Sequence, residues 1–217
     1  MLENRKHVFW EALLIAILIF SIGLVFGVYL EQLRSSDSNS LFYQSEISLY
    51  DSLTLGRVMD NPSVSCDDLK KANINFADKV YSEAKLLGKF DGANKITQDI
   101  KLIHRKYDLL RTLQWIDLIN LKKKCGDINT VVYLYVYESN NIEQKAKQSV
   151  WSKVLQDLKQ NQGDKIILLP IAADQNVTSL DYLISQYNIT EFPAVVINEK
   201  MVVYNQTSFE ELRRYLK

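Results

Sequence analysis

The pattern of apolar and polar positions divides the chain into three parts. Residues 8–30 are apolar almost throughout. From residue 41 to residue 125, apolar side chains return every three or four positions, which is the period of an amphipathic helix. After residue 129, short β-branched runs alternate with helical patterns. We therefore predict an α/β protein with a cytoplasmic tip and membrane anchor (1–34), a helical stalk (35–126) and a C-terminal domain (127–217).

The apolar run at residues 8–30 is long enough to cross a membrane, because a helix rises about 1.5 Å per residue and the hydrocarbon core is about 30 Å thick. It has no polar face, unlike a buried helix of a soluble protein. A secretory signal usually has an apolar region of about 7–15 residues and a small-x-small cleavage site, and neither is found here. We predict a single-pass anchor, with a cleaved signal as the alternative.

Flanking charges predict the orientation of this anchor. Arg5 and Lys6 precede the run, whereas Arg34 follows it among serines and an aspartate. The positive-inside rule then favours a cytoplasmic N-terminus and an extracytoplasmic body. Three Asn-x-Thr triplets, at Asn176, Asn188 and Asn205, are candidate glycosylation sites and agree with that side.

Three helices are predicted between the anchor and the C-terminal domain, after a polar spacer at residues 35–40. The first begins at Leu41 and should end near Asn61-Pro62, because the residue before proline avoids the α region. Its predicted inward positions are Phe42, Ser45 or Glu46, Leu49, Leu53 and Gly56.

The second helix is opened by Ser65 and carries a stripe of Leu69, Ala72, Phe76, Val80, Ala84 and Leu87. A turn at 88–92 leads to the third helix, whose stripe is Ile96, Ile100, Ile103, Tyr107 and Leu110, and which closes with Lys122, Lys123, Lys124 and Gly126. These stripes have two interpretations: an intramolecular three-helix stalk, or a coiled coil that makes a homodimer.

The chain's two cysteines lie at the outer ends of the predicted hairpin. Cys66 opens the second helix and Cys125 closes the third, so an antiparallel hairpin brings them together. We predict a structural disulfide, which an extracytoplasmic location permits. The alternative is a redox couple, although the pair lacks the Cys-x-x-Cys spacing that lowers a thiol pKa.

The C-terminal domain is predicted to have the order βαβαββα. Strands are expected at 130–137 and 165–171, helices at 142–160 and 179–187, with Thr178 or Ser179 capping the latter. Two strands follow Phe192-Pro193, separated by a reversal at Glu199-Lys200 and ending at Tyr204, and Ser208 opens a final helix.

The sequence Thr190-Glu191-Phe192-Pro193-Ala194-Val195-Val196, in this order of elements, resembles the cis-proline loop of the thioredoxin-like superfamily. Ala172-Ala173-Asp174 after the second strand is also similar to that family. The resemblance implies a cis peptide bond at Pro193. It also implies that Phe192 offers its backbone to an extended peptide, flanked by Tyr137 and Trp151. The alternative is a core aromatic beside a structural turn.

The chain departs from this family where the redox dithiol should be. Residues 138–144 contain no cysteine, so this segment cannot perform thiol–disulfide exchange, and nothing supplies a base for Ser139. Both histidines, His7 and His104, lie outside the domain, and His104 is expected on an exposed helix flank. We therefore expect no cofactor, metal cluster or catalytic triad.

The charge balance argues against nucleic acid as a partner, since Lys+Arg and Asp+Glu both number 26. The sequence as a whole favours a membrane-anchored, redox-inactive, thioredoxin-like protein that binds or scaffolds another protein and is not an enzyme. The alternative is an atypical oxidoreductase that uses Cys125 and Cys66. A third interpretation is a subunit whose helices pack into a larger membrane complex.

Overall fold

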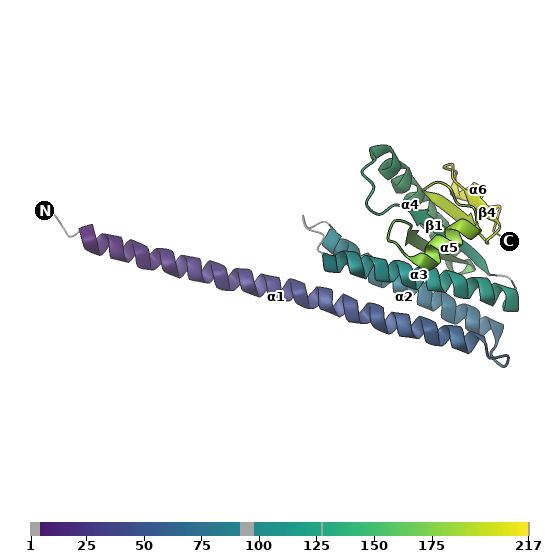
Figure 1. Ribbon diagram of the computed structural model, residues 1–217, viewed down its shortest axis with the longest axis horizontal. Coiled ribbons are helices and arrows are strands. Elements are labelled where there is room, and N and C mark those ends of the chain that lie inside the picture. Colours follow the sequence, from purple (N-terminus) through teal and green to yellow (C-terminus); the bar gives the residue numbers. More distant parts are fainter. Residues whose placement is uncertain (1–4, 92–97, 127, 217) are drawn as a thin grey trace. The chain divides into compact units, whose positions relative to one another are not determined.

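The computed structural model describes residues 5–91, 98–126 and 128–216. Three helices come first: α1 (Arg5–Met59), α2 (Cys66–Asp91) and α3 (Gln98–Cys125). A mixed α/β region follows (Figure 1). The chain forms two compact units, Met1–Tyr43 and Gln44–Lys217, which we describe separately.

In the first unit, α1 is apolar and long enough between His7 and Gln32 to cross a membrane, and every side chain in that range is exposed. A signal sequence has the same character. The hydroxyl of Ser21 donates to the carbonyl oxygen of Ile17 at 2.8 Å, so this polar group is satisfied within the helix. The predicted spacer at 35–40 is wrong: α1 is continuous through it, because serine is tolerated in helices and the segment has no glycine or proline.

The predicted helix ends are largely confirmed in the second unit. α1 ends at Met59, where the ammonium of Lys124 donates to the carbonyl oxygens of Met59 and Asn61, both at 2.7 Å. Ser65 caps α2 through the backbone N–H of Asp67 at 3.3 Å. Gly126 follows α3 with a φ of 70°.

The predicted turn at 88–92 is too early, because α2 continues to Asp91. Ile96 lies outside the described residues. The remaining inward positions of α2 and α3 are buried or partly buried, as the intramolecular interpretation requires: Leu69, Ala72, Phe76, Val80, Ala84, Leu87, Ile100, Ile103, Tyr107 and Leu110. Figure 1 shows these two helices side by side.

The predicted inward face of α1 is wrong in part. Leu53, predicted to face inward, is 45% exposed. Ser45 is fully buried as predicted, but so are Ser48 and Ser52, which were not among the predicted inward positions. The hydroxyl of Ser48 donates to the carboxylate of Glu83 on α2 at 3.1 Å, so a partner on another helix satisfies this polar group. A serine row also lets helices approach closely, which periodicity of apolar residues alone does not reveal. Phe42, at the end of the first unit, is 39% exposed.

Four strands form one mixed sheet: β1 (Asn129–Tyr135), β2 (Ile166–Ala172), β3 (Ala194–Ile197) and β4 (Met201–Val203). Their order is β2-β1-β3-β4, with β1 parallel to β2 and the other pairs antiparallel. Helices α4 (Ile142–Gln162), α5 (Thr178–Gln186) and α6 (Phe209–Arg213) connect or follow them, with the short helix η1 (Gly163–Lys165) before β2. The predicted βαβαββα order is confirmed, with ends shifted by a few residues.

The predicted N-cap of α5 is wrong, whereas that of α6 is confirmed. Val177 is the N-cap of α5 and makes no side-chain cap bond, so neither Thr178 nor Ser179 plays that part. Ser208 caps α6 as predicted, since its hydroxyl accepts the backbone N–H of Glu211 at 3.3 Å.

The sheet is covered on both faces (Figure 1). On one face, Trp115 and Leu118 of α3 and Leu180 of α5 share a core with Val132 and Leu134. On the other, α4 and α6 contribute a second cluster, which contains Trp151, Leu155, Leu158 and Leu212 beside Val131 and Val195. Helix α3 therefore belongs both to the helical layer and to the sheet's core.

The two edges of the sheet are formed by β2 and β4. Pro170 lies inside β2, in register with Tyr133 of β1. Proline lacks an N–H and is tolerated in an edge strand because its nitrogen can face away from the neighbouring strand. Strand β4 has only three residues, and both edges are therefore short or interrupted rows of hydrogen-bonding groups.

Candidate functional site

Three loops meet at one end of the sheet. The register pairs Tyr135 with Ala172 and Leu134 with Ala194, so β1 and β2 end where β3 begins. The segments after β1, after β2 and before β3 are thereby brought to the same edge. In open α/β sheets this is where ligands usually bind.

Asp174 holds the first two of these loops together. Its carboxylate accepts the backbone N–H of Tyr137 at 2.8 Å and that of Glu138 at 3.0 Å. Asp174, which was noted in the sequence for its position after the second strand, therefore holds the segment that leads into α4.

Hydroxyl and amide side chains form a hydrogen-bond network at the start of α4. Asn141 caps the helix, accepting the backbone N–H groups of Glu143 and Gln144 at 2.9 and 3.2 Å. The hydroxyl of Ser139 donates to the side-chain oxygen of Gln144 at 2.5 Å, and the amide of Gln144 donates to the carbonyl oxygen of Phe192 at 3.3 Å. Segment 138–144 and the proline loop are therefore linked by Gln144.

The peptide bond between Phe192 and Pro193 is cis, as the resemblance implied. The side chain of Phe192 is partly buried and packs against the core on the α3 face of the sheet. This position favours the interpretation of Phe192 as a core aromatic. Its backbone carbonyl, the group expected to meet a peptide, already accepts from Gln144.

Trp151, predicted to flank this site, and His104, predicted to lie on an exposed helix flank, are both placed differently from the expectation. Trp151 is completely buried in the second core cluster and cannot flank a docking surface, because its position on α4 faces the sheet. His104 is only partly exposed, and its ring lies 4.5 Å from that of Tyr137, so the expectation of an exposed flank is wrong. Tyr137 does lie at this end, half-buried on the loop after β1.

Ile142 is the residue of this end that sequence reasoning missed. It is the first residue of α4 and is 84% exposed, the most exposed of the large apolar side chains in the described chain. The signal was present in the sequence, because an isoleucine directly after the polar run 138–141 is outside the apolar stripe of α4. A large apolar side chain is thus left in water beside the loops at this end of the sheet.

A buried carboxyl group lies behind these loops. Asp108 of α3 is 2% exposed and accepts the backbone N–H of Ala172 at 3.0 Å, with the guanidinium of Arg111 3.5 Å away. Burial raises the pKa of Asp108 to about 7, although Arg111 and the Ala172 N–H favour the ionised form. Burial also raises the pKa of Tyr135 nearby. This group joins α3 to the end of β2.

Cys66 and Cys125 form a disulfide bond, with their Cα atoms 5.5 Å apart. Cys125 ends α3 and is followed by β1, whose seven residues span about 20 Å at the usual rise per residue. The disulfide is therefore separated from the loops at the carboxyl end of β1 by the length of that strand.

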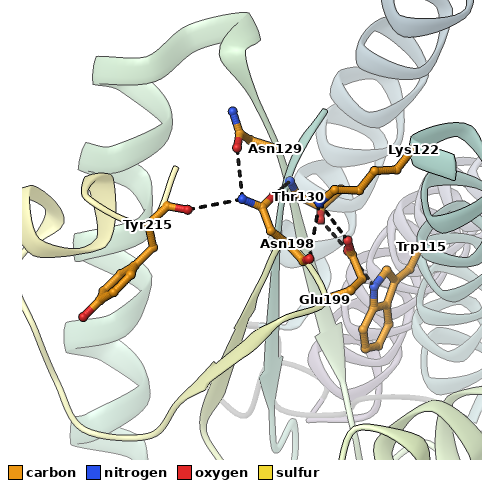
Figure 2. Close-up of polar contacts among 7 residues, drawn as sticks. All are labelled: Trp115, Lys122, Asn129, Thr130, Asn198, Glu199 and Tyr215. Atoms are coloured by element: carbon orange, nitrogen blue, oxygen red, sulfur yellow. Dashed lines mark hydrogen bonds and ion pairs between the residues drawn. The ribbon is translucent and has the colours of Figure 1, made fainter. Parts of the chain in front are cut away.

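The opposite end of the sheet carries a dense polar junction (Figure 2). The β3–β4 reversal is centred on Asn198 and Glu199, with φ values of 54° and 56°, and not on Glu199-Lys200 as predicted. The Glu199 carboxylate pairs with Lys122 at 3.1 Å and accepts from the indole of Trp115 at 3.3 Å and from the hydroxyl of Thr130. These contacts attach the hairpin to α3.

The Asn198 side chain extends the same junction. It accepts the backbone N–H of Thr130 at 3.0 Å and donates to the side chain of Asn129 and to the carbonyl oxygen of Tyr215 (Figure 2). A cleft of about 430 Å³ lies beside it, with Lys122 and Arg214 among its lining residues.

The candidate glycosylation residues Asn176, Asn188 and Asn205 are all exposed. Asn176 and Asn188 have positive φ values of 54° and 51°, which asparagine adopts readily in turns. Within the described ranges, no group of three or more His, Cys, Asp or Glu side chains could hold a metal ion.

Comparison of the sequence with protein-family models and with curated protein sequences gives no match.

Proposed function

We propose that this chain is a membrane-anchored, redox-inactive, thioredoxin-like protein that binds another protein through the loops at the carboxyl end of β1. The observation that carries the binding proposal is the exposed Ile142, which is 84% accessible beside the Gln144–Phe192 link. Covering this side chain with a partner would remove its apolar surface from water, which favours association.

The thioredoxin-like assignment is supported by topology. A parallel β1–β2 pair joined by a helix, an antiparallel β3–β4 hairpin, and helices on both faces agree with the fold that the proline loop implies. The assignment rests on this architecture and on the residues 190–196.

The redox-inactive assignment is supported by the position of the sulfur atoms. The chain has two cysteines, and both are in the Cys66–Cys125 disulfide. Thiol–disulfide exchange needs a thiolate at the reacting position, and here that position carries Ser139, Asn141 and Gln144. The alternative oxidoreductase would have to use a disulfide that lies before the start of β1, a strand about 20 Å long, whereas the proline loop lies at its carboxyl end.

Four observations support an anchor with an extracytoplasmic body. The helix between His7 and Gln32 is long and apolar enough to span a membrane. Arg5 and Lys6 precede it, which favours a cytoplasmic N-terminus. A disulfide persists most readily in an oxidising compartment, and the three sequon asparagines are exposed.

Site-specific photocrosslinking in intact cells tests the binding proposal. The full chain carries a photoreactive residue at Ile142 or, as a matched control, at Val150, which lies on the same helix and is 46% exposed. A discrete adduct with one protein at Ile142, absent at Val150, is the expected result. Equal labelling at both positions, or none at Ile142, contradicts the proposal.

A thiol-exchange assay separates the two candidate functions. Purified full chain is expected to show no catalysed reduction of a disulfide substrate, and a Cys66→Ser/Cys125→Ser variant should behave identically. Turnover that disappears in the double variant would instead assign the oxidoreductase function to this cysteine pair.

A further inference from the structure

One face of α3 lies against the sheet and its loops, and this face changes character along the helix. Its positions recur at spacings of three and four residues from Lys101 to Lys122. Towards the C-terminal end, Trp115 and Leu118 belong to the sheet's core, so apolar contacts hold this part of α3 in place. The N-terminal half of the same face carries ionisable side chains instead: Lys101, His104, Asp108 and Arg111.

The N-terminal half of α3 contacts the loop after β1. The ammonium of Lys101 pairs with the carboxylate of Glu138 at 2.6 Å, and the ring centroid of His104 lies 4.5 Å from that of Tyr137. The backbone N–H groups of the same two loop residues donate to Asp174. Tyr137 and Glu138 are therefore held through their backbone by the loop after β2, and through their side chains by α3.

The same part of α3 also contacts the end of β2 and the loop that follows it. The guanidinium of Arg105 donates to the carbonyl oxygen of Asn176 at 2.6 Å. The carboxylate of Asp108 accepts the backbone N–H of Ala172 at 3.0 Å. Residues of about two helical turns thus contact both loops that meet beside the proline loop. We call the residues that make these contacts the α3 strap: Lys101, His104, Arg105 and Asp108.

The contacts of the α3 strap can be lost without disrupting the core of the sheet. The side chains of Lys101 and Glu138 are 46% and 49% exposed, and exposed ion pairs add little to stability because water and salt screen them. A polar interface also permits relative motion more readily than a large apolar one. The α3 strap can therefore release the loops while Trp115 and Leu118 keep the rest of α3 on the sheet.

Release of the α3 strap affects the segment that leads directly to Ile142, since Glu138 lies on the loop before α4. A loop that is ordered before binding loses less conformational entropy when a partner binds than a loop that must be ordered by the partner. We propose that the α3 strap controls the candidate binding site: attached, it holds the loops in the arrangement that binds a partner through Ile142, and its release weakens that binding. This inference rests on the proposed function, because it assigns the regulation of the same site.

Exchanging the charges of Lys101 and Glu138 in the full chain tests this control. Lys101→Glu brings two carboxylates together, whereas Lys101→Glu/Glu138→Lys restores an ion pair with its charges exchanged. Lys123→Glu is the control, because it makes the same charge change at an exposed position near the other end of α3. We expect Lys101→Glu to lower the photocrosslinking yield at Ile142 at least threefold. In purified protein it should accelerate amide hydrogen exchange at residues 137–141 and 173–177 at least threefold.

The exchanged pair should restore both measurements, which excludes general misfolding of Lys101→Glu, and Lys123→Glu should change neither. Unchanged hydrogen exchange in both loops of Lys101→Glu overturns the proposal, as does a yield that the exchanged pair does not restore. A full crosslinking yield from Lys101→Glu contradicts this inference alone. An adduct that is absent even with Lys101 in place contradicts the proposed function, and this inference with it.

Discussion

The carboxylate of Asp108, midway along α3, accepts the backbone N–H of Ala172 at the end of β2 at a distance of 3.0 Å. This bond joins the helical layer to the sheet just behind the candidate binding loops. Since Asp108 is almost completely buried, its protonation state affects how firmly the two layers are joined.

The raised pKa of Asp108 predicts a pH dependence of stability. Its folded pKa of about 7 exceeds the ordinary value of 3.8, so the folded state keeps a proton that the unfolded state loses. The stabilisation that the folded state gains from this proton is fully present below about pH 4. It disappears as the pH rises towards 7, and the unfolding free energy then falls by at most about 1.4 kcal/mol per pH unit.

An Asp108→Asn variant removes this titration. Between pH 5 and pH 7 the unfolding free energy of the original chain should fall, because Asp108 loses its proton. The unfolding free energy of Asp108→Asn should fall less over the same range, as measured by urea unfolding in detergent. Asp117, whose pKa is raised to about 6 by burial and by Asp60, gives a slope of the same sign in both proteins and cancels. A difference that does not vary with pH would contradict the assignment.

Glu199 is expected to stabilise the junction between α3 and the β3–β4 hairpin. Glu199→Ala removes the partner of Lys122, Trp115 and Thr130 and should cost roughly 2–3 kcal/mol. Alanine and glutamate are both strained at positive φ, so the backbone term largely cancels. Lys200→Ala, at the exposed neighbouring position, should change the unfolding free energy by less than about 0.5 kcal/mol. Similar losses for both variants would argue against this role.

Removal of the disulfide should destabilise the second unit. The bond joins residues separated by 59 positions, for which the chain-entropy estimate is on the order of 4 kcal/mol. Cys66→Ser/Cys125→Ser and chemical reduction of the unmodified chain should lower the thermal midpoint by the same amount. If thiols are alkylated before lysis and a gel then shows two free thiols, the bond does not form in the cell.

Gln144 is expected to restrain the candidate binding loop. Gln144→Ala frees the carbonyl of Phe192 to accept from a partner, so the crosslinking yield at Ile142 should rise a few-fold. The lost hydrogen bond should lower stability by only about 1 kcal/mol. Lys145→Ala, one residue further along α4, is the control and should leave the yield unchanged. A fall in yield for Gln144→Ala would mean that Gln144 orders the loop for binding.

Local signals in the sequence predicted the ends of elements well. Residues that begin or end a helix depend only on neighbours within one helical turn. Helices begin or end near four of the predicted positions: Asn61-Pro62, Ser65, Gly126 and Ser208. The pairing of Cys66 with Cys125 was also predictable, because it needed only an antiparallel hairpin.

The features that sequence reasoning missed depend on distant partners. Ser48 is buried because Glu83 lies opposite it, and Glu199 occupies a strained turn because Lys122 and Thr130 hold its carboxylate. The helical period specifies which residues share a face, but the identity of the covered face is decided by other elements.

Pro170 affects the tendency of copies of this chain to aggregate through the edges of their sheets when they are close together. An uninterrupted edge strand can pair with the edge of a neighbouring molecule and begin aggregation, a hazard that grows when proteins are concentrated on a surface. Pro170 interrupts the donor row of β2, and β4 offers only three residues. Strand-to-strand polymerisation is thereby disfavoured at both sides of the sheet, which leaves loop and helix surfaces for specific contacts.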